Sequence, residues 1–172
     1  MQALAGAIME SELDMVVHEQ QAVLSQLLTR VALVQGTERR LAFDALARAL
    51  FAHLAVLRSV LLPNAGDREF SRQIAESGQL VAGIVARTIV EQQGVGPKHD
   101  IQALMTSVLS LLSQESALLK TAFDNLSLEA QRALATEADA EFSRLAGPYE
   151  LEELPAIWTT FNEPGTTDGA RQ

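Results

Sequence analysis

The sequence of 172 residues contains no cysteine, and this excludes disulfides, thiolate nucleophiles and zinc–thiolate sites. Aromatic residues make up only 5% of the chain, so any core must be built mainly from aliphatic side chains. Alanine, leucine, glutamate, glutamine and arginine are abundant instead, and these residues favour helices. With 48% hydrophobic residues, a chain of this length can bury a core as a single domain without disulfides or metals.

Positive charge and long apolar runs are also scarce. Lys and Arg total 13 against 22 Asp and Glu, and the net charge of −9 argues against a nucleic-acid partner. Residues 1–9 lack the basic start and apolar run of a signal peptide. Residues 80–90 are apolar but too few to span a bilayer, and they include Arg87. We expect a cytoplasmic protein that binds neither nucleic acid nor a membrane.

Apolar residues recur at intervals of three and four, which is typical of amphipathic helices. Four long helical segments are expected to begin near residues 10, 37, 67 and 97, with a fifth over about 127–145. Thr37, Asp67 and Ser127 are plausible N-caps. Short breaks between similar helices predict an all-α fold: an antiparallel up-down four-helix bundle with an additional C-terminal helix and an extended arm. Residues 1–147 would form the bundle and fifth helix, and 148–172 a partly disordered arm.

Two stretches of the second and fourth helices resemble each other, His53-Leu-Ala-Val-Leu57-Arg58 and Gln114-Glu-Ser-Ala-Leu118-Leu119. In each, a polar residue lies within an apolar stripe, and apolar residues follow one turn later. With Asp14 and His18 on the first helix, this frame resembles the hemerythrin-like, or HHE cation-binding, family. That family has His-x-x-x-Glu-Glu on helices two and four, and histidines on helices one and three. The resemblance covers about residues 10–145.

The resemblance implies a set of interior polar residues in place of the family's metal ligands. His18 and His53 match family histidines, Gln79 lies close to the helix-three histidine, and Gln114 replaces the helix-four histidine. Leu57 and Arg58, and again Leu118 and Leu119, stand where the family has its carboxylate pairs. The interior polar site implied in this way consists of His18, His53, Gln79, Gln114 and Glu115.

Ligand chemistry sets this site apart from the family's di-iron centre. Such a centre needs several imidazoles and bridging carboxylates, whereas glutamine is a weak ligand and leucine is none. We therefore predict no metal ligands, no cofactor and no catalytic residues. A lone histidine on an apolar helix face, such as His53, is more often a hydrogen-bonded core residue than a ligand. If Glu115 is buried it needs a partner, and His53 and His18 are candidates.

Three functions remain open at this point. The leading hypothesis is a non-enzymatic binding or regulatory protein. It could form a homodimer through its helix faces or through the arm around Trp158. The alternative is an iron-binding protein that binds oxygen or senses redox state at an altered site built from His18, His53 and Glu115. A third is a pocket for a small apolar ligand in the vacated site, which fails if Leu57, Leu118 and Leu119 fill that space.

Overall fold

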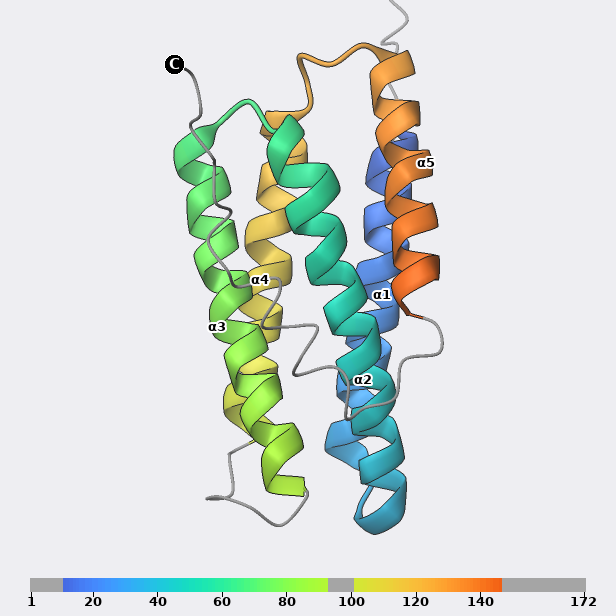
Figure 1. Cartoon of the computed structure of the whole chain (residues 1–172), viewed down its shortest axis with the longest axis vertical. Coiled ribbons are helices and arrows are strands. Elements are labelled where there is room, and N and C mark those ends of the chain that lie inside the picture. The colour runs from blue at the N-terminus through green and yellow to red at the C-terminus, as the bar shows by residue number, and fades with distance from the viewer. Residues whose placement is uncertain (1–10, 93–100, 147–172) are drawn as a thin grey trace, which may run out of the picture.

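The computed structural model describes residues 11–92 and 101–146, and throughout these residues the chain is helical with no strand. The helices lie side by side along the long dimension of the molecule (Figure 1). They are α1 (Glu12–Leu33), α2 (Gly36–Val56), α3 (Arg68–Gln92), α4 (Ile101–Ala122) and α5 (Leu128–Leu145). The all-α prediction is confirmed. The arm predicted for 148–172, with Trp158, lies outside the described residues.

Short side chains cap three of the helices and fix where they begin. Ser11 and Asp14 form a reciprocal capping box at the start of α1. The backbone N–H of Phe70 donates to Asp67 at 3.0 Å before α3, and that of Ala130 donates to Ser127 at 3.2 Å before α5. The predicted caps Asp67 and Ser127 are therefore confirmed.

The predicted cap at Thr37 is wrong. Helix α2 begins one residue earlier, at Gly36, after Gln35, whose side chain makes no capping hydrogen bond. Gly36 has a φ of 58°, a left-handed conformation that glycine adopts without steric cost. The glycine thus lets the chain reverse direction right after the two residues that separate α1 from α2. Thr37 then lies inside the first turn of α2 and cannot be its N-cap.

Helix α2 does not end at Val56 but changes its winding. A π-helical turn, η1 (Leu57–Leu61), follows directly, and then a 3₁₀ turn, η2 (Leu62–Asn64), that contains Pro63. Within this stretch Leu57, Val60 and Leu61 are buried while Arg58 and Ser59 are exposed. Along this turn Leu57 therefore faces the core and Arg58 faces solvent.

The core lies mainly between α2 and its neighbours. Helix α2 packs against α1 and α5, α3 packs chiefly against α4, and α1 also contacts α4 and α5. The continuous helical stretch Gly36–Asn64 is long and apolar enough to cross a membrane, but 72% of its most apolar window is buried inside the protein. Burial among the other helices accounts for its composition. Within the described residues this stretch, and not residues 80–90, is the helix with the length and composition of a membrane span.

One of the two glycines inside α3 has a packing role. A Cβ added at Gly78 would come within 3.2 Å of Leu54 Cδ2 on α2, which is tighter than most real contacts. At Gly83 the nearest atom outside the helix backbone would be Arg87 Nη1, at 3.8 Å. Only Gly78 therefore reflects a close approach between helices.

Candidate functional site

A histidine and a glutamate meet in the centre of the protein. His53 lies in the last turn of α2 and Glu115 lies on α4, and both side chains are 0% exposed. His53 Nε2 is 2.8 Å from Glu115 Oε2. The expectation that a buried Glu115 would need a partner is met by His53, whose position one turn before the π-helical segment directs it toward α4.

Gln20 of α1 extends this contact into a chain across four helices. Its Nε2 donates to the backbone carbonyl of Ala138 on α5 at 3.4 Å, and its Oε1 lies 2.9 Å from His53 Nδ1. The polar chain thus runs from α5 through α1 and α2 to α4, and we call Gln20, His53 and Glu115 the buried triad. All three side chains lie among aliphatic core residues, with Gln20 only 4% exposed.

The hydrogen bonds fix the proton on one ring nitrogen of His53. Because Gln20 donates through its Nε2 to a carbonyl, its Oε1 must be the acceptor for His53, so Nδ1 carries a hydrogen. At 2.8 Å the lone pairs of Nε2 and a carboxylate would repel each other without a proton between them. One hydrogen therefore lies between His53 Nε2 and Glu115 Oε2.

Next to the triad, α1 and α4 present two further polar atoms. Glu115 Oε1 and Gln21 Nε2 are buried and have no hydrogen-bond partner among the residues described. Gln21 Oε1 accepts a hydrogen bond from Ser116 Oγ at 3.3 Å, so its amide lies against the residue that follows Glu115. The interior is therefore not fully satisfied, and each such atom costs about 1–3 kcal/mol of folding free energy.

The other predicted site residues do not join this group. His18 on α1 and Gln79 on α3 are exposed, because each lies about 100° around its helix from a buried neighbour. Gln114 is half-buried and bonds elsewhere: it accepts from Ser77 Oγ at 2.8 Å and donates to Ser110 Oγ at 3.3 Å. The prediction that these three residues share one interior site with His53 is therefore corrected, since only His53 and Glu115 meet.

Gln20 was not among the predicted site residues, although a signal for it existed. It lies three residues after Val17 and four before Leu24, both 0% exposed, so it occupies a core position of the α1 stripe. In the sequence, Gln20 is a polar residue that interrupts that apolar stripe. A polar residue at a core position indicates a buried hydrogen bond, and here that bond goes to His53.

Three of the four residues that the resemblance would place at carboxylate positions are core leucines. Leu57, Leu118 and Leu119 are buried in the main hydrophobic cluster of the protein, and Arg58 faces solvent. These three leucines are part of the packed core. Their packing argues against a small apolar ligand at these positions.

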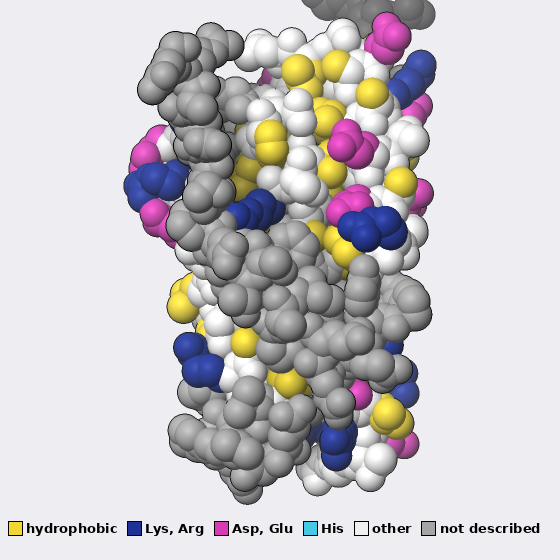
Figure 2. Space-filling view, in the orientation of Figure 1, with side chains coloured by type: hydrophobic (Ala, Val, Ile, Leu, Met, Phe, Trp, Pro, Cys, Tyr) yellow, Lys and Arg dark blue, Asp and Glu magenta, His cyan; other side chains and the backbone are white. Residues whose placement is uncertain are grey.

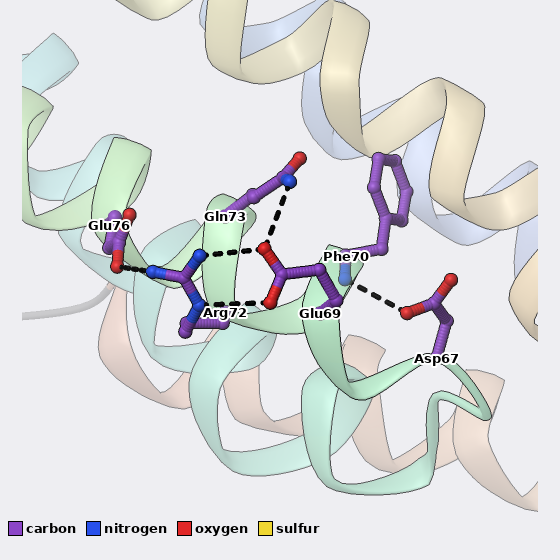
Figure 3. A network of polar contacts seen from close by, with 6 residues as sticks. All are labelled: Asp67, Glu69, Phe70, Arg72, Gln73 and Glu76. Atoms are coloured by element: carbon purple, nitrogen blue, oxygen red, sulfur yellow. Dashed lines mark hydrogen bonds and ion pairs between the residues drawn. The ribbon is translucent and has the colours of Figure 1, made fainter.

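A second polar network lies on the surface at the start of α3 (Figure 3). Arg72 contacts Glu69 through two nitrogen atoms, at 3.2 and 2.6 Å, and also pairs with Glu76. The hydrogen bond from Arg72 lowers the pKa of Glu69 below its usual value. All three side chains are more than half exposed, and Figure 2 shows basic side chains scattered singly on the visible face. This network is a solvated helix face.

No group of three or more His, Asp or Glu side chains that could hold a metal ion occurs within residues 11–92 and 101–146. Comparison with known proteins adds no assignment: no protein-family model, no curated protein and no solved structure matches this chain.

Proposed function

We propose that this chain is a non-enzymatic binding or regulatory protein of the cytoplasm, built as a hemerythrin-like antiparallel four-helix bundle of α1–α4 with α5 added. Two observations support the architecture. Successive helices run in alternate directions in Figure 1, and α5 packs on the α1–α2 side and not between the pairs. The kinship with the hemerythrin-like family rests on the sequence frame around His53 and Gln114.

The observation that carries the proposal is that both ring nitrogens of His53 are bonded to protein atoms. A histidine ligand must offer a ring lone pair to the metal, and here Nδ1 donates to Gln20 while Nε2 shares a proton with Glu115. A metal ion could enter only by replacing that proton, and it would then find one imidazole and one carboxylate. A di-iron site needs several of each. We therefore interpret the triad as a set of buried hydrogen bonds that connects the helices.

Large apolar side chains are also exposed on the outside of the helices. Leu33, Leu41, Leu80, Leu109 and Leu128 are each at least half exposed, and they are spread over all five helices. Single exposed apolar residues of this kind are normal on a protein surface, so the proposed binding role does not rest on them. The homodimer remains part of the proposal.

The test is iron loading of untagged protein under anaerobic conditions, followed by elemental analysis and absorption spectroscopy. We expect less than stoichiometric iron and no absorption band of an oxo-bridged centre. His53→Ala should lower stability without changing the iron content, and His18→Ala, at an exposed position, should change neither. Stoichiometric iron that is lost in His53→Ala but kept in His18→Ala would overturn the proposal in favour of the iron-binding alternative.

The mass of the protein in solution tests whether the proposed homodimer forms. Light scattering over a range of concentrations should give twice the chain mass of 18.6 kDa if the homodimer forms. A single-chain mass at every concentration would remove the homodimer and leave binding to a different protein.

A further inference from the structure

A groove of about 380 Å³ lies where the first half of α2 meets the C-terminal end of α5. Its walls are apolar apart from two charged side chains, and the wall residue Leu41 is 63% exposed. The lining residues are Leu41, Asp44, Ala45, Arg48, Ala49 and Ala146. The groove lies outside the buried triad and shares no residue with it.

The two charged residues of this groove offer hydrogen-bonding atoms that nothing else uses. Asp44 Oδ1 and Arg48 Nε are buried atoms with no hydrogen-bond partner in the part of the chain that is described. Buried polar atoms in folded proteins are nearly always hydrogen-bonded. These two atoms of the groove residues therefore lack the partner that a buried polar atom usually has.

We propose that the chain's own residues 147–172 bind in this groove, with an acidic side chain on Arg48. The position of the groove supports this occupant, because Ala146, the last residue described, forms part of its wall. The following residues are thus tethered at the site at high effective concentration.

The groove holds one acidic and one basic side chain, and Arg48 can pair with an acidic residue of the segment. Glu150, Glu152 and Glu153 supply carboxylates, and a guanidinium binds a carboxylate through charge-assisted hydrogen bonds. Around them the segment carries apolar side chains that suit Leu41 and the alanines of the wall. These are Tyr149, Leu151, Leu154, Ile157, Trp158 and Phe161.

A second copy of the chain fits the groove less well. Stable interfaces between proteins involve about 20–30 residues on each side, whereas six residues line this groove. A tethered segment needs no such area, because its binding carries no loss of overall translational freedom.

The absence of native cysteine makes disulfide trapping a clean test in the full chain. Ala45 lines the groove and is exposed, so Ala45→Cys with Leu154→Cys, the groove pair, places one thiol in the groove and one in the segment. A disulfide forms only when the two Cα atoms approach to about 4.4–6.8 Å. We expect the groove pair to close within the monomer at least about tenfold faster than a control pair, Ala32→Cys with Leu154→Cys. Ala32 is exposed on the last turn of α1 and lines no part of the groove.

Charge variants test the assigned role of Arg48. Arg48→Glu should slow the closing of the groove pair several-fold, and Arg40→Glu, an exposed position on the same helix, should leave it unchanged. Changing Glu150, Glu152 and Glu153 to Lys in the Arg48→Glu background should restore the rate. Circular dichroism checks that each variant keeps its helices, and Arg48→Gln replaces Arg48→Glu if the charge reversal unfolds the protein.

Three outcomes would overturn the inference. Equal rates for the groove pair and the control pair would mean that the segment does not occupy the groove. A disulfide-linked dimer as the main product would assign the groove to the segment of a second copy. An unchanged closing rate in the folded Arg48 variant would rule out the carboxylate–guanidinium contact.

Discussion

The buried triad and the surface network of α3 are built from the same kinds of interaction but differ in their surroundings. In the triad, His53 and Glu115 are 0% exposed, so each depends on the other for solvation. In the surface network, Arg72 and Glu69 are 58% and 63% exposed, and water can replace either partner. The comparison shows that the number of polar contacts says little about stability, and that the loss of solvent decides what a missing partner costs.

The largest effect is expected from Glu115→Ala. This change leaves the buried His53 without its partner at Nε2, and removing one member of a buried pair costs about 3–5 kcal/mol of unfolding free energy. Urea unfolding followed by circular dichroism measures the loss. Glu19→Ala, which removes an exposed carboxylate on α1, is the matched control and should change little. Equal stabilities for the two variants would contradict the buried role of Glu115.

The next effect tests how far the triad extends. Gln20→Ala removes the acceptor of His53 Nδ1 and should cost about 1–3 kcal/mol, since a buried donor is left unsatisfied. Gln26→Ala, at an exposed position of the same helix, should be close to neutral. A loss as small as that of Gln26→Ala in the same urea measurement would show that the Gln20 contact carries no weight.

Removing the whole triad should cost less than removing one member. Leucine at positions 20, 53 and 115 removes all three polar side chains of the triad at once, and such replacements are often neutral or stabilising by about 1–4 kcal/mol. We expect the triple variant to be more stable than Glu115→Ala by thermal and urea unfolding. If the triple variant is instead the least stable of the set, the polar chain contributes to the fold beyond its own hydrogen bonds.

The smallest effect is expected in the surface network. Arg72→Ala should leave the stability unchanged in the same measurements, because the charges stay hydrated. It should raise the pKa of Glu69 back toward its ordinary value, as measured by NMR titration of the carboxyl group. A carboxyl with a lowered pKa stabilises the fold only above its ordinary pKa and loses that contribution as the pH falls through the lowered value. High salt should reduce the pKa difference between wild type and variant, and a difference that survives about 1 M salt would indicate a stronger pair than proposed.

Features that depend on a short stretch of chain could be predicted from the sequence, whereas contacts between distant helices could not. Local signals were enough for the helices: Asp67 and Ser127 cap α3 and α5 as expected, because a cap acts within one turn of its own chain. Thr37 failed as a cap because Gly36 allowed an earlier start. The need for a partner at Glu115 was readable from its place beside an apolar stripe.

The sequence by itself determined five amphipathic helices, an aliphatic core and a few polar residues at core positions, because these follow from side-chain spacing along the chain. Only the tertiary structure decided which polar residues meet. His53 lies 33 residues from Gln20 and 62 from Glu115, and their contact depends on how three helices are rotated against one another. Successive side chains on a helix point about 100° apart. His18 therefore faces solvent although its neighbour Val17 is buried, and Gln20 faces the core and joins the triad.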